Sequence, residues 1–286
     1  MPDSLPILRR RIRNVEDLRA VVKSMKAMSA ASITQFEQAA NAVAEAQRAV
    51  ERALSVCLRG PGAPEPPATR PAASTRRGFV VFGGDQGMAG QFNEHAAEAA
   101  REHLAAAPAT TRFWTVGERV QSRLEDAGHR PAKHFPAPQS IEAASPLVSE
   151  LLLEIENAFL AGEVDRVDLC HNAPVSRAHY ETRWTRLLPL DEAWRETLRR
   201  TPWPGRALPE MIECGSKPWT ALVSEYLFVA LYRVCAESGA AENAARRCGW
   251  GCRAGRARRR GRAVAGRRRG RCRAGNCRNT CRRRRR

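Results

Sequence analysis

Several kinds of site and segment are missing from this 286-residue sequence. It has no apolar run approaching the roughly 18 residues needed to cross a bilayer, so any attachment to a membrane is expected to come through another protein. Its six histidines show no metal-ligand spacing, and no zincin, facial-triad or nucleophile-elbow motif is present. The sequence therefore predicts no catalytic centre, no metal site and no cofactor.

Cysteine is sparse in the first 246 residues, where Cys57, Cys170, Cys214 and Cys235 stand singly. Isolated cysteines without a signal peptide predict a reducing, cytoplasmic environment. The other five cysteines lie in residues 247–286, a segment that contains eighteen arginines but no lysine, aspartate or glutamate. The net charge of +18 belongs entirely to that segment, because the rest of the chain has 30 basic and 30 acidic residues.

Proline and glycine are absent between Pro6 and Gly60, and this segment carries a seven-residue repeat. Spacings of 3 and 4 sustained over about seven heptads predict a coiled-coil strand that needs a partner helix. At about 1.5 Å per residue, the helix would be roughly 80 Å long. One set of repeat positions is Leu8, Val15, Val22, Ser29, Phe36, Val43 and Val50; the other is Arg11, Leu18, Met25, Ser32, Ala39, Ala46 and Ala53.

The rest of the chain divides by composition into a small α/β domain between connecting segments and a second helix. Short apolar runs at 78–82, 112–116, 166–172 and 180–190 predict strands of a mostly parallel sheet, with helices at about 93–107, 117–127 and 141–161. The expected segments are an N-terminal coiled-coil helix (1–59), a Pro-rich linker (60–77), the α/β domain (78–190), an irregular connection (191–217), a second coiled-coil helix (218–246) and a disordered Arg/Cys-rich tail (247–286).

The stretch "FGGDQGMAGQFN" at 82–93 follows a predicted strand and opens a helix, where a phosphate-binding loop would lie. It matches neither the phosphate-loop pattern nor the dinucleotide pattern, which leaves ligand binding as the lesser alternative. We interpret it as a structural loop in which Gly84, Asp85, Gly87 and Asn93 shape a turn and cap a helix.

Three motifs in order resemble the gamma subunit of F-type ATP synthases. "LRRRIRNVEDLRAVVKSMKAMSAAS" resembles the family's opening helix, "FVVFGGDQGMAGQFN" its strand and T-D-R-G-L-C-G-x-x-N loop, and "SEYLFVALYRVCAESGAAENAARR" its R-Y-V-E-S … E-N-L-A-S-E-x-A-A-R-M helix. The resemblance covers about residues 1–246. Glu-Asp at 16–17, where ordinary gammas have Asn-Thr, makes the opening more like the gamma-like subunit of the alternate (N-ATPase type) complexes.

The resemblance implies a non-catalytic rotor shaft, with long antiparallel terminal helices and a small Rossmann-like α/β domain. The shaft would turn inside the alpha and beta subunits, while its foot, with the epsilon subunit, would sit on the membrane c-ring at the cytoplasmic face of a bacterial inner membrane. It would couple proton or sodium flow to ATP synthesis or hydrolysis. By the same resemblance Lys23, Met25 and Lys26 would face the hexamer, and Tyr226 would lie in the foot near the ring.

Residues 247–286 occupy the length where the family's second helix would continue, but seven glycines and a single aliphatic larger than alanine, Val264, exclude a coiled-coil strand. A shift of reading frame at or after codon 246 is the favoured hypothesis. An Arg-rich nucleic-acid-binding arm is the functional alternative, although Trp250 is its only aromatic residue, and a zinc site at Cys248/Cys252 and Cys277/Cys281 is a third. Without that strand, Leu8, Val15, Leu18 and Val22 would be exposed or frayed.

Overall fold

The computed structural model describes residues 5–60, 76–87, 89–106, 111–176, 179–207, 209–210 and 217–247. Most of the expected linker, and the expected tail from residue 248 onward, lie outside these ranges. The described residues form two long helices, a five-stranded sheet and four shorter helices.

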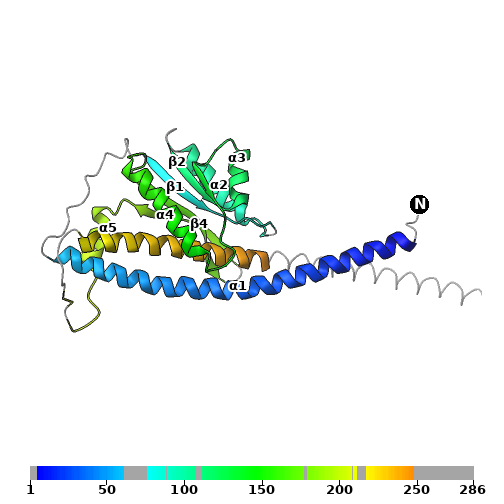
Figure 1. The fold of residues 1–286 in the computed structure, drawn as a ribbon, viewed down its shortest axis with the longest axis horizontal. Coiled ribbons are helices and arrows are strands. Elements are labelled where there is room, and N and C mark those ends of the chain that lie inside the picture. The colour runs from blue at the N-terminus through cyan, green and yellow to red at the C-terminus, as the bar shows by residue number, and fades with distance from the viewer. Residues whose placement is uncertain are drawn as a thin grey trace, which may run out of the picture.

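The two long helices lie side by side and run in opposite directions (Figure 1). The first, α1, spans Leu5–Arg59, and the second long helix spans Lys217–Arg247. Phe36 of α1 packs with Ala236 and Ala240, and further along the pair Arg233 donates a hydrogen bond to Gln47 across 3.2 Å. The expected antiparallel pairing is therefore confirmed.

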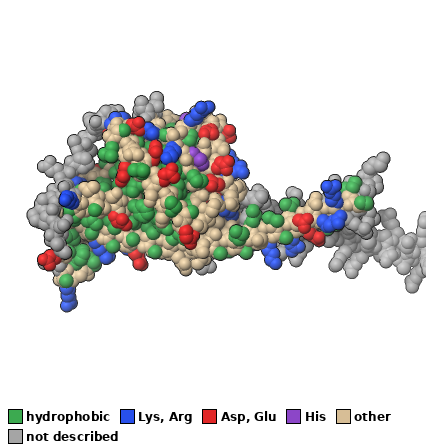
Figure 2. All heavy atoms as spheres, viewed as in Figure 1, with side chains coloured by type: hydrophobic (Ala, Val, Ile, Leu, Met, Phe, Trp, Pro, Cys, Tyr) green, Lys and Arg blue, Asp and Glu red, His purple; other side chains and the backbone are tan. Residues whose placement is uncertain are grey.

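The N-terminal part of α1 projects beyond the rest of the described chain as a thin arm (Figures 1 and 2). Val15 is 63% exposed and Leu18 64% exposed, and the first buried side chain along α1 is Ser29. The expected exposure is confirmed for these two residues, whereas Val22 is half-buried. α1 is a continuous helix from Leu5, and the side chain of Leu8 lies outside those that the structure describes.

The α/β domain has a sheet in the order β3-β2-β1-β4-β5. The first four strands are parallel and β5 is antiparallel to β4, as expected for a mostly parallel sheet. The strands are β1 (Arg77–Phe82), β2 (Arg112–Val116), β3 (Lys133–Phe135), β4 (Arg166–Ser176) and β5 (His179–Leu188). The helices between them are α2 (Phe92–Ala105), α3 (Glu118–Asp126) and α4 (Ala144–Leu160).

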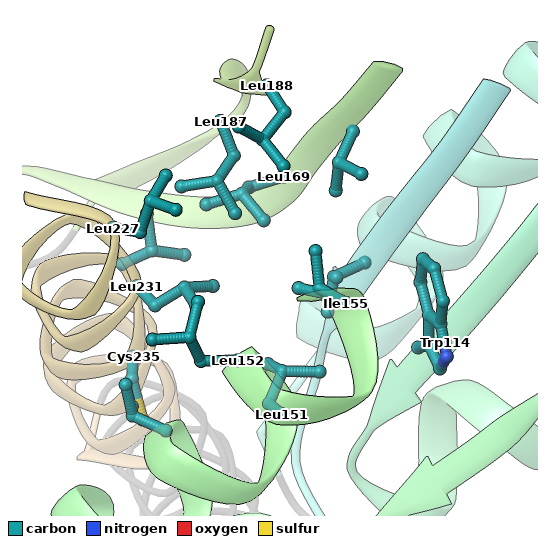
Figure 3. Packing of buried hydrophobic residues seen from close by; sticks show 14 of the residues in the cluster. Trp114, Leu151, Leu152, Ile155, Leu169, Leu187, Leu188, Leu227, Leu231 and Cys235 are labelled. Atoms are coloured by element: carbon teal, nitrogen blue, oxygen red, sulfur yellow. The ribbon is translucent and has the colours of Figure 1, made fainter. Parts of the chain in front are cut away.

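Alternate side chains of β1 enter different layers of the fold, as the two-residue period of a strand requires. Phe79 and Val81 pack against α2 and α3, whereas Val80 and Phe82 belong to the larger core. In that larger core α4 lies between the sheet and the second long helix (Figure 3). Leu151 and Leu152 of α4 meet Leu227, Leu231 and Cys235 of the second long helix there.

By length and composition the second long helix could cross a membrane, although Glu225, Arg233 and Glu237 interrupt its apolar sequence. Its apolar side chains are accounted for by the core of the α/β domain, in which Leu231 is fully buried. A helix covered on two sides by other elements is apolar over a broad face for that reason alone.

The buried side of α1 differs from the expected heptad positions. In the first set, Ser29 and Phe36 are buried as expected. Ile33 and Leu54 are also buried, although each lies four residues after a member of that set. Ala46, a member of the second set, is exposed. A residue four positions along lies on the same helix face, so the pattern alone did not distinguish the two neighbouring stripes.

A short helix, α5 (Glu192–Arg200), lies within the segment expected to be irregular. The Asp191 side chain caps it by accepting a hydrogen bond from the Trp194 backbone N–H at 3.0 Å. Arg59, at the end of α1, donates to the Arg199 carbonyl at 3.1 Å. The expectation of an irregular connection over 191–217 is therefore wrong for Glu192–Arg200. Two helix signals were missed there: the capping residue Asp191, and the apolar residues Trp194 and Leu198 at a spacing of four.

Close approach of the two long helices depends on Gly239. A Cβ atom at this position would lie 2.7–3.0 Å from three ring carbons of Phe36, which is itself 1% exposed. Glycine in a helix interior costs about 1 kcal/mol relative to alanine. The space that it gives to a buried aromatic ring offsets this cost.

We predict that Gly239→Ala lowers the free energy of unfolding by about 1–3 kcal/mol, because the Phe36 ring must move out of its site. Urea unfolding of the full chain measures this. Ser224→Ala, at an exposed position of the same helix, is the control and should have little effect. A Gly239→Ala variant more stable than the parent, the usual result in an open helix, would contradict the packing argument.

Candidate functional site

The three residues expected to face partner subunits lie on the projecting arm of α1. Lys23 and Lys26 are exposed, and Met25 is 38% exposed. Hydrophobic and basic side chains share this arm in Figure 2. The apolar ones, each exposed, are Ile7, Ile12, Val15, Leu18, Val21, Met25 and Met28. The arm is therefore a narrow rod with a mixed surface and no concave site among its described residues.

The loop expected to be structural is held by hydrogen bonds inside the α/β domain. The Asp85 carboxylate accepts from the Glu118 backbone N–H at 2.8 Å, at the start of α3, and from the Ala137 N–H at 3.1 Å. The Asn93 side-chain oxygen accepts from the Gly84 N–H at 2.9 Å. Asp85 thus caps the N-terminus of α3, whereas the helix that this loop opens, α2, begins at Phe92 without a side-chain cap.

Gly84 and Gly87, the two glycines expected to shape this loop, have different surroundings. A Cβ atom at Gly84 would overlap the Glu242 carboxyl group of the second long helix, so the loop backbone lies directly on that carboxyl. A Cβ at Gly87 would meet only the end of the Arg119 side chain at 3.8 Å. The loop is therefore a contact between the α/β domain and the second long helix, and Gly84 is the residue that permits it.

A second contact between the same two parts is made by His171 and Glu237. His171 of β4 is 2% exposed, and its Nε2 lies 3.0 Å from a Glu237 carboxylate oxygen. The other Glu237 oxygen accepts from Arg233 at 2.8 Å, and Arg233 reaches Gln47 of α1. One chain of hydrogen bonds therefore connects the sheet, the second long helix and α1.

Burial raises the pKa of the Glu237 carboxyl, but hydrogen bonds from His171 and Arg233 outweigh it, so the pKa is lowered from its ordinary value of 4.5. A lowered pKa means that the folded protein favours the ionised carboxylate. The stabilisation is therefore present above the ordinary value and is lost as the pH falls through the folded-state pKa.

The expected foot residue, Tyr226, lies inside the protein. It is 9% exposed, and its ring centroid lies 5.1 Å from that of Trp194 on α5. Burial raises the pKa of its hydroxyl group. The exposed side chains at this end of the second long helix include those of its neighbours Ser224 and Glu225. The cover of Tyr226 by α5 was not expected, because α5 lies in the segment expected to be irregular.

A cleft of about 400 Å³ opens beside Tyr226, between β5 and α5. Its charged lining groups are already paired: Asp168 accepts from Arg166 at 2.7 and 3.1 Å, and Arg186 donates to Asp191 at 2.7 Å. His103, stacked on Trp184 at 4.3 Å, has its pKa lowered by burial. These charged groups therefore neutralise one another within the cleft.

The cysteines and acidic groups of the described chain form no reactive centre. Cys170 and Cys235 are buried, and burial raises the pKa of each thiol to about 12, so both are protonated near neutral pH. Within the residues that the structure describes, no group of three His, Cys, Asp or Glu side chains could hold a metal ion.

Comparison with known proteins identifies the family. A model of the ATP synthase family matches residues 4–248, which includes both long helices and the whole α/β domain. The chain belongs to the ATP synthase gamma family. The match ends two residues beyond the expected limit of the resemblance and excludes nearly all of the Arg-rich segment. Gamma chains are non-catalytic subunits, consistent with the absence of a catalytic motif from the sequence.

Relatives of this family are similar over most of the chain. The ATP synthase gamma chain of Phenylobacterium zucineum is 32% identical over 198 residues, which are 66% of this chain and 67% of the relative. The gamma chain of Pelotomaculum thermopropionicum is 23% identical over 244 residues, covering 85% and 84% of the two chains.

The fold is that of solved ATP synthase central stalks. A chain of the Tetrahymena thermophila mitochondrial central stalk and c-ring structure has a TM-score of 0.57 at 17% identity, covering 82% of this chain and 99% of that one. A chain of the Euglena gracilis mitochondrial rotor structure has a TM-score of 0.58 at 13% identity, covering 87% and 90%. These likenesses establish the family's fold.

We predict that Glu237→Gln destabilises the full chain by about 1–3 kcal/mol at pH 7, because the charged hydrogen bonds to His171 and Arg233 are weakened. The difference should shrink as the pH falls below the ordinary glutamate value of 4.5, where the parent also loses its charge. Denaturant unfolding at several pH values measures both effects, with the exposed Glu225→Gln as control. An equal loss of unfolding free energy in both variants would contradict a specific role for the Glu237 hydrogen bonds.

Proposed function

We propose that this chain is the central rotor shaft of an F-type ATP synthase, coupling ion flow through the membrane c-ring to ATP synthesis or hydrolysis in the alpha–beta hexamer. One observation carries the proposal. A 55-residue helix runs continuously from the α/β domain into a thin projecting arm, and the half of it next to the domain is paired with a second long helix. A slender helical rod fixed to a globular base can transmit torque without a catalytic site of its own.

The arm is the part that enters the hexamer in this proposal. Lys23, Met25 and Lys26 are its contacts with the catalytic beta subunits, a role supported by their exposure and by the family resemblance of "KSMKAMSAAS". Small side chains follow at Ser29 and Ala30, and these keep the rod narrow at the point where the second long helix meets it.

The opposite end of the rod, with the α/β domain, contacts the epsilon subunit and the c-ring. Tyr226 serves this foot from inside by supporting α5 through its contact with Trp194, and the contacts with the ring come from exposed neighbours such as Glu225. The complex lies at the cytoplasmic face of a bacterial inner membrane, and the ring transports protons or sodium. The Glu-Asp pair at 16–17 favours the sodium-type complexes of the N-ATPase class.

Reversing two charges on the arm tests the hexamer contact. In a complex assembled from this chain with the alpha and beta subunits of its own organism, we expect Lys23→Glu together with Lys26→Glu to lower ATP hydrolysis about tenfold. New charge repulsion within a formed interface costs on the order of 1–2 kcal/mol, which corresponds to that factor. Steady-state hydrolysis by the complex measures the loss.

The matched control reverses Arg48 and Arg52, which are exposed on α1 beside the α/β domain. Both double variants should unfold like the parent when isolated, because none of the four side chains is buried. Full hydrolysis by the Lys23/Lys26 variant would show that the arm does not meet the hexamer through these residues. An equal loss in the control would assign the effect to charge alone.

We also propose that the gene changes reading frame at or just after codon 246. The family match ends at residue 248, and the seven glycines that follow cannot continue a coiled-coil helix. Sequencing the gene through codons 235–290 and beyond, with translation in all three frames, tests this. We expect another frame to encode a helix rich in Ala, Met and Leu that supplies a strand opposite Val15 and Leu18. If the frame is confirmed and neither alternative encodes such a helix, this proposal is wrong.

A further inference from the structure

Glu242 occupies the point where the α/β domain meets the second long helix. Its side chain comes from that helix and is 7% exposed. The backbone of the loop after β1 lies directly on its carboxyl group, because Gly84 has no side chain to hold the two apart. The contact between the domain and the shaft is thus made on an ionisable group.

The charges around Glu242 come from two elements. Arg246, one turn further along the same helix and 9% exposed, forms an ion pair with it. The loop brings Asp85, whose carboxylate is of the same sign as ionised Glu242. From α3, Arg119 approaches the loop only at Gly87, and Glu118 meets Asp85 through its backbone N–H. The buried residues that α1 contributes along this part of the rod, Ser29, Ile33 and Phe36, carry no charge.

Glu237, five residues earlier on the same helix, is the natural comparison. The α/β domain gives Glu237 a hydrogen-bond donor, His171, and its pKa is lowered. Near Glu242, in contrast, the domain places the carboxylate of Asp85. Burial raises the pKa of Glu242 to about 7; Arg246 opposes that rise and Asp85 adds to it. The two glutamates therefore respond to pH in opposite directions, at two contacts with the same domain.

We propose that Glu242 is a proton-dependent joint between the α/β domain and the shaft. When the carboxyl group is neutral, the loop at Gly84 seats on the second long helix without charge repulsion from Asp85. When the group is ionised, a second negative charge enters the buried contact beside Asp85, and the loop is held less tightly. The second contact, at Glu237, stays formed through this range and keeps the domain attached.

The joint is a property of this chain alone, and only its consequence for rotation rests on the proposed rotor function. In a rotor, a fall in pH toward 6 would stiffen the connection between shaft and base, and a rise toward 8 would relax it. Failure of the chain to assemble with alpha and beta subunits would count against the rotor and leave the joint standing. The experiments below use the isolated full chain and count only for or against the joint.

The sign of the pH effect follows from the raised pKa. The folded state keeps a proton on Glu242 that the unfolded chain releases near the ordinary pKa of 4.5. The stability that Glu242 contributes is therefore greatest at acidic pH and falls until the pH passes about 7. In thermal unfolding between about pH 5 and pH 8, we expect the parent to lose about 5 °C more than Glu242→Gln, which cannot ionise. Glu225→Gln, exposed on the same helix, should behave like the parent.

A second measurement needs no variant. Amide hydrogen exchange at Gly83–Asp85, corrected for the intrinsic effect of pH, should show greater opening at about pH 8 than at about pH 6, with a midpoint near 7. The amides of α5, which packs beside Tyr226 near the other end of the second long helix, should show no such step. A parent and Glu242→Gln with the same pH slope, or loop amides that follow those of α5, would overturn the joint.

Discussion

Burial of the second long helix on two sides is the constraint on which the rest of this structure depends. One side packs Ala236, Gly239 and Ala240 against Phe36 of α1, and the other packs Leu227 and Leu231 against α4 and the sheet. Because close-packed interiors move as units, a helix shared by two cores joins them into one body. The rod and the α/β domain are connected by shared side chains and not only by the chain between them.

Polar contacts determine where along the rod the domain is fixed. The hydrophobic contact of α4 with the second long helix is non-directional and tolerates sliding. His171 with Glu237 is specific to position, because a displaced buried charge loses its partner. The loop at Gly84 is also specific to position, because a residue with a side chain could not lie on the Glu242 carboxyl group. Apolar packing therefore holds the parts together, and contacts at two glutamates of the second long helix set their register. These contacts place the arm bearing Lys23 and Lys26 at a fixed distance from the base.

The buried thiols, the paired charges and the exposed arm fit what a shaft requires. The described surface has no metal cluster, its buried thiols are protonated, and the cleft beside Tyr226 is lined by charges that neutralise one another. Among the described residues, most of the exposed large apolar side chains lie on the arm, including Val15 and Leu18. A membrane-coupled complex whose chemistry lies in other chains accounts for both observations. The chain's own task is then mechanical, and its informative residues lie in contacts.

The sequence by itself determined the helix of α1 and the four principal strands, because period and breaker residues act over a few positions. The antiparallel pairing of the long helices was implied by the family resemblance. It could not determine which of two adjacent stripes on α1 is buried, that α5 covers Tyr226, or that Gly239 makes room for Phe36. It also gave no sign that Glu242 would meet a loop more than 150 residues away in the chain. Those outcomes depend on contacts between distant segments, and such contacts choose among arrangements that local physics leaves nearly equal in free energy.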